Sequence, residues 1–370
     1  MLLEVSHEGQ GVRCRWADGR GERFPAIWLR DNCPCAECRD PGTGQRLLTV
    51  LSIPEEIAPG AVAVTDGGDL EVVWTPGGHR SRYDAAWLRA YAGLPARRAP
   101  VLWDATLSPP RFRWEAVRSD EEAQYRWLTA VRDIGFALLS GVPAQAGEVE
   151  RVAAVFGYIR ETNYGRTFDV VSVPRPTHLA YTARALAAHV DNPYRVPGLG
   201  LQMLHCIEAA PEGGESLLVD GFRIAAELKA RDPAAFETLT RVPLPFGYRD
   251  AETDLYARQP VIALDVEGEL RAIHYNERVA QPLEAPARQA EAFYTAYRQF
   301  ARLVVDPAFE VRFRLASGDL LLFDNERLLH GRTAYDGNAG RRFLQGCYVD
   351  RDGLESRLRL LARRLGKEAV

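Results

Sequence analysis

Residues 320–332 read Leu-Leu-Leu-Phe-Asp-Asn-Glu-Arg-Leu-Leu-His-Gly-Arg. The apolar run Leu320–Phe323 predicts a buried strand, because strands covered on both faces read as continuous apolar segments. His330 follows this strand after a short polar stretch and two further leucines. A histidine held at such a place by a sheet is a candidate functional residue, and the rest of the chain supplies the groups that belong with it.

A second candidate lies far upstream, where His189 and Asp191 are separated only by Val190. In an extended segment residues i and i+2 point to the same side, so both side chains can hold one ion. An isolated His-x-Asp pair is more often a surface or hydrogen-bonded pair than a ligand set. With His330 it completes a 2-His-1-carboxylate facial triad, which leaves coordination positions open on non-haem Fe(II).

Two arginines follow His330 at a short distance, Arg341 and Arg342, and lead into a predicted strand over 343–348. A guanidinium there can form a bidentate pair with a carboxylate of an iron-bound oxoacid. The complete pattern of His-x-Asp, distant His and nearby Arg is typical of Fe(II)/2-oxoglutarate oxygenases. It predicts a mainly β fold with helices (α+β), in which a double-stranded β-helix, or jelly roll, carries the chemistry.

The N-terminal part contains a different cluster, Cys33, Cys35 and Cys38, which holds three of the six cysteines. Zinc draws thiolates together at about 2.3 Å and takes four ligands in structural sites. His79, in the turn-like stretch Pro76-Gly-Gly-His79, is the fourth ligand that we expect. Such a closed Cys₃His site is structural, and the alternative is a group of free or redox-linked thiols.

Length and charge set the outer limits. A chain of 370 residues exceeds the roughly 250–300 residues at which single cores stop growing, so we expect two domains, 1–95 and 96–370. The net charge of −4 argues against nucleic acid or an anionic membrane surface as a partner. We find neither an export signal nor about 20 consecutive apolar residues, which favours the cytoplasm.

The local patterns indicate further elements. Alternation around the turn Asp18-Gly19 predicts a hairpin in a β-rich N-terminal domain. Acidic residues at the start of the segment 119–132 suit the first turn of a helix. A second long helix is expected near 284–305. The stretches 158–175 and 248–259, rich in Pro, Tyr and Arg, are interpreted as loops.

Several long motifs carry a resemblance to a known family. They include Trp28-Leu-Arg-Asp-Asn-Cys-Pro-Cys-Ala-Glu-Cys38, Ala180-Tyr-Thr182, Gly213-Gly-Glu-Ser-Leu-Leu-Val-Asp-Gly221 and Phe323-Asp-Asn-Glu-Arg-Leu-Leu-His-Gly-Arg332. In this order they resemble the γ-butyrobetaine dioxygenase and trimethyllysine dioxygenase family, a taurine-dioxygenase-like branch of 2-oxoglutarate oxygenases, nearly from end to end. The resemblance implies Fe(II), 2-oxoglutarate and O₂ in the catalytic domain, structural Zn(II) in the N-terminal domain, and a homodimer.

The resemblance also assigns roles to residues. It makes His189, Asp191 and His330 the iron ligands, and places Arg342, Ser216 and Leu204 at the 2-oxoglutarate. It implies an aromatic cage for a cationic substrate, formed by Tyr164, Phe168, Tyr181 and Tyr348. Aromatic faces suit a quaternary ammonium group, which has no N–H to donate. Phe168 replaces a Trp common in the family, which would make the cage looser.

The other end of the substrate is where the sequence departs from the family. His178 stands where the family uses an asparagine for the substrate carboxylate, and Asn276 is the second polar contact that we expect there. The implied activity is hydroxylation of an unactivated C–H bond of a small trimethylammonium substrate, with γ-butyrobetaine giving carnitine. Alternatives are a trimethylammonium phosphonate, trimethyllysine or a natural-product intermediate, and, from another class, a non-catalytic zinc-containing interaction protein.

Overall fold

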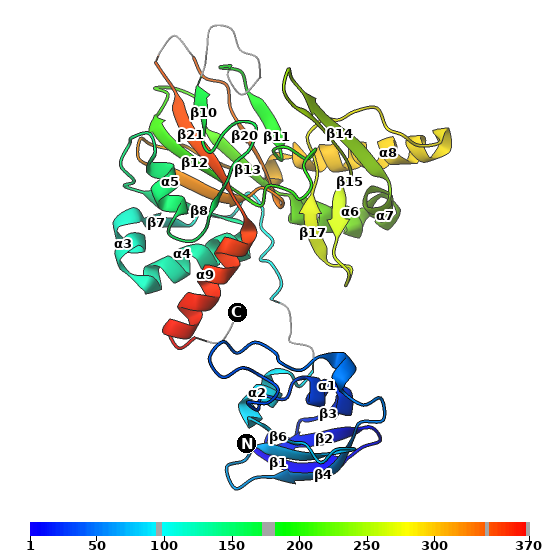
Figure 1. Ribbon diagram of the computed structural model, residues 1–370. Coiled ribbons are helices and arrows are strands. Elements are labelled where there is room, and N and C mark those ends of the chain that lie inside the picture. Colours follow the sequence, from blue (N-terminus) through cyan, green and yellow to red (C-terminus); the bar gives the residue numbers. More distant parts are fainter. Residues whose placement is uncertain (94–97, 172–181, 337–339, 368–370) are drawn as a thin grey trace. The chain divides into compact units, whose positions relative to one another are not determined.

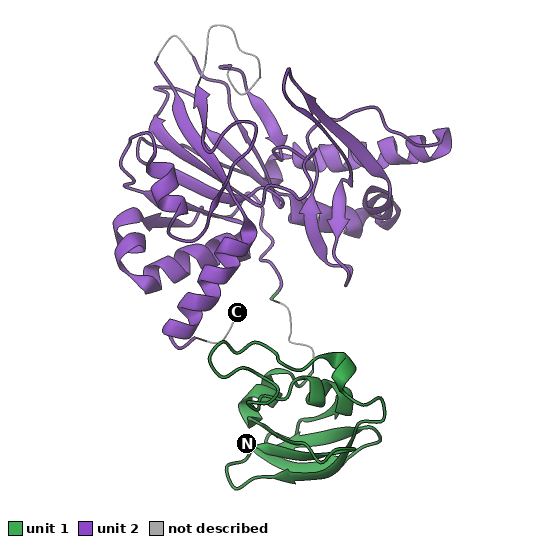
Figure 2. Cartoon of the chain, viewed as in Figure 1, with its two compact units in different colours: residues 1–98 green, residues 99–370 purple. Residues whose placement is uncertain are grey.

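The computed structural model describes residues 1–93, 98–171, 182–336 and 340–367 (Figure 1). The chain forms two compact units, Met1–Arg98 and Ala99–Val370, which are described separately (Figure 2). The boundary predicted after residue 95 falls among residues 94–97, outside the described part of the chain. Nowhere in that part is a helix both long and apolar enough to cross a membrane.

The described residues of unit 1 form two small antiparallel sheets, with strand orders β1-β2-β3 and β4-β5-β6, two short α-helices and one 3₁₀ helix, η1. Their bounds are β1 Leu2–His7, β2 Gly11–Trp16, β3 Gly21–Pro25, α1 Ala26–Asp31, η1 Val50–Ser52, β4 Ala58–Val64, β5 Leu70–Thr75, β6 Arg80–Tyr83 and α2 Ala85–Ala90. The sheets share one core, in which Trp16, Phe24 and Trp74 are buried. The predicted β-rich character and the hairpin at Asp18-Gly19 are confirmed.

Unit 2 contains two facing sheets that form the double-stranded β-helix. The larger has the order β10-β21-β12-β19-β8-β7, with β9 also paired to β21, and the smaller has the order β11-β20-β13-β18. The strands of the larger sheet are β7 Arg111–Arg113, β8 Phe136–Ser140, β9 Ile159–Arg160, β10 Phe168–Val171, β12 Leu201–Glu208, β19 Leu320–Asp324 and β21 Phe343–Val349. Those of the smaller are β11 Leu186–His189, β13 Ser216–Asp220, β18 Glu310–Phe313 and β20 Leu328–Arg332.

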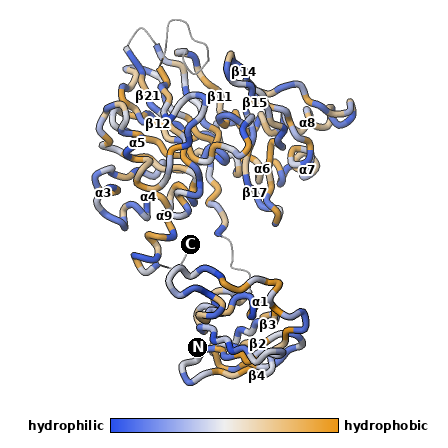
Figure 3. Tube along the Cα trace, viewed as in Figure 1, coloured by the Kyte–Doolittle hydropathy of each residue, from blue (hydrophilic) through white to orange (hydrophobic). Residues whose placement is uncertain are grey.

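Apolar side chains of both sheets meet between them, as Leu204 and Phe323 do with Leu218 and Phe313. Helices α3 Trp114–Ser119, α4 Glu121–Ile134, α5 Glu148–Ala153 and α9 Arg351–Arg364 share a second core with the outer face of the larger sheet (Figure 1). Helices α6 Gly221–Arg231, α7 Pro233–Arg241 and α8 Ala287–Val304 share a third core with β13. Figure 3 shows apolar and polar residues alternating along many of these elements.

The helix predicted over 119–132 is α4, and it begins there because the Asp120 carboxylate accepts hydrogen bonds from the main-chain N–H groups of Glu122 and Ala123. The long helix predicted near 284–305 is α8.

The two predicted loops were wrong. Residues 158–175 contain β9 and β10. Most of 248–259 belongs to a hairpin of β14 Pro243–Arg249 and β15 Asp254–Pro260. On its other edge β14 forms one isolated bridge, Phe246 with Ala280, where the Pro245 carbonyl accepts from the Gln281 N–H, so the N–H that proline lacks is not needed there. A further hairpin, β16 Ile262–Leu264 with β17 Leu270–Ile273, follows it.

Candidate functional site

The cysteine cluster of unit 1 lies just after helix α1. The Nε2 atom of His79 lies 3.4 Å from the Sγ atom of Cys33, 3.7 Å from that of Cys35 and 3.7 Å from that of Cys38. One ligand atom from each of the four residues falls within 4.8 Å of the others. This is the donor set of a structural zinc site, and no member of it is left for chemistry.

Neighbouring polar groups support the cluster. Ser81 donates a hydrogen bond to the Cys33 sulfur at 3.0 Å, and Arg30 donates one to Cys38 at 3.2 Å. Glu37 lies 3.5 Å from Nδ1 of His79, where it can fix the ring with Nε2 turned toward the thiols. Donors to the sulfurs stabilise thiolates, so the surroundings fit a bound cation as well as the ligands do.

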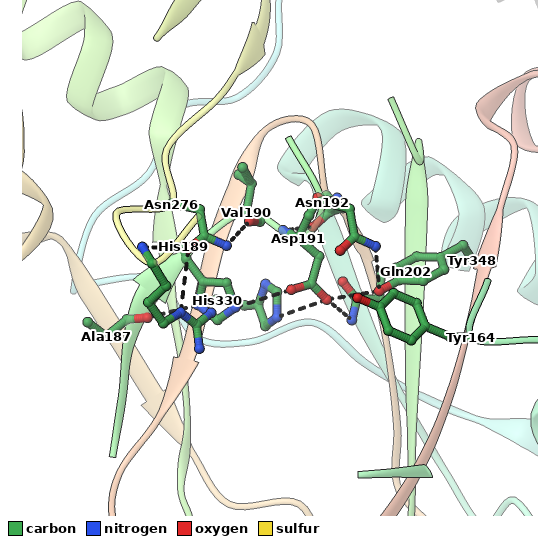
Figure 4. A network of polar contacts seen from close by, with 12 residues as sticks. Tyr164, Ala187, His189, Val190, Asp191, Asn192, Gln202, Asn276, His330 and Tyr348 are labelled. Atoms are coloured by element: carbon green, nitrogen blue, oxygen red, sulfur yellow. Dashed lines mark hydrogen bonds and ion pairs between the residues drawn. The ribbon is translucent and has the colours of Figure 1, made fainter. Parts of the chain in front are cut away.

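The second cluster is built by the smaller sheet of unit 2. Strands β11 and β20 pair so that His189 lies directly opposite His330, with ring centroids 4.4 Å apart. Asp191 follows two residues after His189, and its two carboxylate oxygens lie 3.2 Å from Nε2 of His189 and 3.8 Å from Nε2 of His330 (Figure 4). The structure therefore brings the three predicted ligands together.

The pKa values of Asp191 and His330 suit a metal. Burial alone would raise the pKa of Asp191, but His330, His189 and the Tyr348 hydroxyl together hold that pKa well below its usual range. Burial and the adjacent His189 lower the pKa of His330 to about 3. The His189 Nδ1–H group donates to the Ala187 carbonyl at 2.8 Å, which leaves Nε2 facing Asp191. At neutral pH Asp191 is thus a carboxylate and His330 a neutral imidazole, the forms in which these groups bind Fe(II).

Two residues orient the Asp191 carboxylate: Gln202, which the sequence analysis missed, and Tyr348, which it placed only in the aromatic cage. Gln202 on β12 donates to Oδ2 at 2.9 Å, and Tyr348 on β21 donates to the same oxygen at 3.0 Å (Figure 4). Gln202 and Tyr348 are direct cross-strand partners, so the register of two strands delivers both donors to one atom. Asn325 holds the backbone of Asp191 from both sides, through its N–H at 2.8 Å and its carbonyl at 3.0 Å.

An open cavity of about 970 Å³ lies beside the trio. Its lining includes all three predicted 2-oxoglutarate residues, Arg342, Ser216 and Leu204. The Arg342 guanidinium is buried, lies over the Tyr335 ring at 5.7 Å, and has no ion-pair partner among the described residues. A buried cation without a counter-ion is costly, so this side chain fits a carboxylate supplied by a ligand.

The structure also separates the two neighbouring arginines. Arg341 is exposed, is absent from the cavity lining, and pairs with Glu208 at 2.9 Å. Room for Arg342 depends on Gly214, since a Cβ there would lie 3.1 Å from the arginine side chain. The motif Gly213-Gly214 is thus tied to the site by packing.

Aromatic residues form another part of the cavity wall. Of the four predicted cage residues, Tyr164, Phe168 and Tyr348 line it, and the Phe168 and Tyr348 rings lie 4.9 Å apart. Phe168 is accommodated by Gly346 opposite it on β21, where a Cβ would come within 2.5 Å of the ring. Tyr194, which the sequence analysis missed, joins this wall and lies 3.1 Å from Tyr164, hydroxyl to hydroxyl.

The remaining predicted residues differ in what the structure says of them. Tyr181 and His178 lie outside the described residues. Asn276 lines the cavity, and its Nδ2 donates to the Val190 carbonyl at 3.0 Å. Its Oδ1 accepts from the main-chain N–H of Arg278 at 3.2 Å. Asn276 is thus bonded to the segment that carries the trio.

Comparisons with known proteins agree with this geometry. Residues 97–348 match the family described as taurine catabolism dioxygenase TauD, TfdA family, and residues 3–89 match the N-terminal region described as gamma-butyrobetaine hydroxylase-like. A gamma-butyrobetaine dioxygenase of Pseudomonas sp. (strain AK-1) is 42% identical over 98% of this chain and 96% of its own. A trimethyllysine dioxygenase of Meyerozyma guilliermondii is 32% identical over 100% and 97%.

Among solved structures, that of AAD-2 in complex with Mn(II) and N-oxalylglycine superposes with a TM-score of 0.53. The match covers 68% of this chain and 98% of the other, at 15% identity. At that identity the likeness concerns the fold alone, and it supports the double-stranded β-helix of unit 2.

Proposed function

The chain belongs to the TauD, TfdA family of dioxygenases, together with γ-butyrobetaine and trimethyllysine dioxygenases, and on that basis we propose that it hydroxylates γ-butyrobetaine to carnitine. It is an Fe(II)- and 2-oxoglutarate-dependent dioxygenase with a structural zinc cluster in unit 1. Because the chain belongs to a family of enzymes, the alternative of a non-catalytic zinc-containing interaction protein is not retained. The observation that carries the substrate proposal is the aromatic wall of Tyr164, Phe168, Tyr194 and Tyr348 in the same cavity as the trio.

Iron with 2-oxoglutarate and O₂ supplies the oxidation of an unactivated C–H bond, and the products are the alcohol, succinate and CO₂. His189, Asp191 and His330 would hold the iron on one side only, because the cavity occupies the other. Gln202 and Tyr348 keep the Asp191 carboxylate in place by donating to Oδ2. The protein thus fixes the ligands and leaves the open side for the reactants.

The cosubstrate and the substrate would enter from different parts of the cavity lining. Arg342 would bind the distal carboxylate of 2-oxoglutarate, with the Ser216 hydroxyl and the Leu204 side chain beside it. The aromatic wall would take the trimethylammonium group, since each well-placed ring contributes about 0.5–2 kcal/mol to binding of a cation. Substrate orientation, with a carbon near the cation aimed at the metal, is then the contribution of the aromatic residues.

The test is a product assay under air with iron and 2-oxoglutarate. Gamma-butyrobetaine, trimethyllysine and a trimethylammonium phosphonate are supplied separately, and mass spectrometry follows the gain of one oxygen atom together with succinate. We expect the highest kcat/KM for γ-butyrobetaine, in line with the more similar of the two relatives. A higher kcat/KM for either other compound would refute the substrate while keeping the chemistry. The homodimer implied by the resemblance is checked by light scattering of the same sample.

A further inference from the structure

A third arginine lines the cavity besides Arg332 on β20 and Arg342, which directly precedes β21. Arg278 lies in the loop after β17 and contributes to the cavity lining. Arg342 is assigned to 2-oxoglutarate, and Arg332 uses its guanidinium on the main-chain carbonyls of Arg184, at 3.3 Å, and Thr182. No carboxylate among the described residues forms an ion pair with Arg278, so its charge is available to a ligand.

Asn276 fixes the direction of this side chain. Its Oδ1 accepts hydrogen bonds from the main-chain N–H of Arg278 at 3.2 Å and from Nε at 3.4 Å. Its Nδ2 holds the Val190 carbonyl at 3.0 Å, between two of the metal ligands. Arg278 is therefore tied through one amide to the segment that carries the reaction centre, and the two terminal nitrogens of its fork remain unbonded to described residues.

The charged groups described around Arg278 supply no counter-ion for its guanidinium. Asp191 is the acid that acts on it, and that carboxylate is committed to the trio. The other titratable neighbours whose electrostatic interaction reaches it are the His330 imidazole and the Arg332 guanidinium, and neither is an anion. Burial lowers the pKa of Arg278, and Asp191 acts in the opposite direction. An arginine stays protonated under these conditions.

We propose that Arg278 binds the anionic end of the substrate and so makes the enzyme selective for zwitterions that carry a carboxylate beyond the trimethylammonium group. This inference rests on the proposed function, because it concerns the same substrate. The aromatic wall takes the cation, the fork of Arg278 takes the carboxylate, and both lie on the lining of one cavity beside the trio. Asn276, which the sequence analysis expected at the carboxylate, becomes a positioning residue for Arg278.

The experiment compares γ-butyrobetaine with its methyl ester, which keeps the trimethylammonium group and loses the negative charge. Binding is measured by calorimetry without oxygen, and turnover is measured separately, for the wild type and Arg278→Gln. We expect Kd and KM for γ-butyrobetaine to rise roughly tenfold or more, because a charge-assisted pair is lost. The corresponding values for the ester should change less than about twofold, and KM for 2-oxoglutarate should stay constant.

A matched control is Arg258→Gln, which removes an exposed guanidinium on β15 that is absent from the cavity lining and pairs with Glu284 at 3.5 Å. It should leave both ligands unaffected. Arg278→Lys keeps the charge without the fork and should lie between wild type and Arg278→Gln. It also serves if the glutamine variant folds poorly.

Three outcomes overturn the inference. One is an equal loss for γ-butyrobetaine and its ester in Arg278→Gln, and another is wild-type binding without preference for the free acid. The third is a rise confined to KM for 2-oxoglutarate, which would assign Arg278 to the cosubstrate. If the wild type binds the free acid selectively but oxidises neither compound, the proposed function fails while the role of Arg278 stands.

Discussion

The two ligand clusters of this chain use similar residues for opposite purposes. In unit 1 four ligand atoms, three thiols and one imidazole, lie within 4.8 Å of one another, and Ser81 and Arg30 donate to the sulfurs. In unit 2 three ligand atoms gather on one side, and a cavity of about 970 Å³ occupies the other. The number of protein ligands therefore distinguishes the two sites. Four ligands complete a structural site, whereas three leave coordination positions open for reactants.

The groups behind the ligands differ in the same way. At the cysteine cluster the neighbours neutralise charge on sulfur. At the trio they aim one carboxylate, because Gln202 and Tyr348 both donate to the same Asp191 oxygen. A ligand is oriented at both sites, His79 by Glu37 and Asp191 by two donors, but only the Asp191 site lines a cavity that can hold reactants. Each side of this contrast can be tested by removing one group.

The largest effect is expected for Asp191→Ala. Loss of the carboxylate leaves only two imidazole ligands for the metal. We expect kcat/KM for 2-oxoglutarate turnover to fall more than about 100-fold, which exceeds the usual loss when a group that orients a ligand is removed. The assay measures succinate and bound iron together. Asp352→Ala, which removes an exposed carboxylate at the start of α9, is the matched control. Full activity of Asp191→Ala would remove the trio from the reaction.

The next largest effect is expected at the Cys₃His cluster of unit 1. Cys38→Ala should abolish zinc binding and lower the free energy of unfolding of unit 1 by more than about 3 kcal/mol, since structural zinc is coupled to folding. Cys14 is a buried thiol of the same unit and lies in its core away from the cluster. Cys14→Ala should cost only about 1 kcal/mol and keep the zinc. Zinc content by mass spectrometry and thermal unfolding check both variants.

Retention of one zinc per chain in Cys38→Ala would contradict the closed site. The iron content of unit 2 is measured in the same samples. It should stay unchanged, because the two ligand sets share no residue. Loss of both zinc and iron in Cys38→Ala would show that the two clusters do not act independently.

A smaller effect is expected for Tyr348→Phe, which keeps the ring in the aromatic wall and removes the donor to Asp191. Iron affinity should fall about tenfold, the lower end for groups that orient a metal ligand. KM for the trimethylammonium substrate should change little, because the aromatic face remains. Tyr194→Phe is the matched control, since the Tyr194 hydroxyl bonds Asn192 and Tyr164 instead. If both variants lose iron equally, the orienting role of the Asp191 bond is wrong.

Sequence patterns predicted the three residues that the structure brings together, but they missed Gln202 and the bond from Tyr348 to Asp191, for a physical reason. His189 and Asp191 are recognisable from their spacing of two in an extended segment. Gln202 becomes relevant only because β12 pairs with β21 in the register that places it opposite Tyr348. That register is a property of the folded sheets. The β14–β15 hairpin was missed similarly, because its prolines argue against a strand unless the pairing leaves their missing N–H groups unneeded, as where the Pro245 carbonyl accepts from Gln281.

The smallest expected effect concerns the pH dependence of stability. It distinguishes loss of the metal site at low pH from unfolding of the sheets that carry it. His205 on β12 is fully buried, and neither ring nitrogen has a hydrogen-bond partner among the described residues. Burial lowers its pKa to about 4 from an ordinary value of 6.5. Below pH 6.5 the unfolded chain therefore binds a proton that the folded chain refuses, and stability falls as the pH drops toward 4.

Replacing His205 by leucine should remove this slope. Between pH 7 and pH 5.5 the wild type should lose about 1 kcal/mol more unfolding free energy than His205→Leu. Urea unfolding at each pH measures the difference, and His7→Leu, at an exposed position of β1, controls for loss of an imidazole. Parallel pH profiles of wild type and His205→Leu would assign the acid sensitivity elsewhere, with the metal trio as the first candidate. A flatter dependence of unfolding free energy on pH in His205→Leu, with unchanged iron content, would instead show that the metal site is retained at low pH until the sheet unfolds.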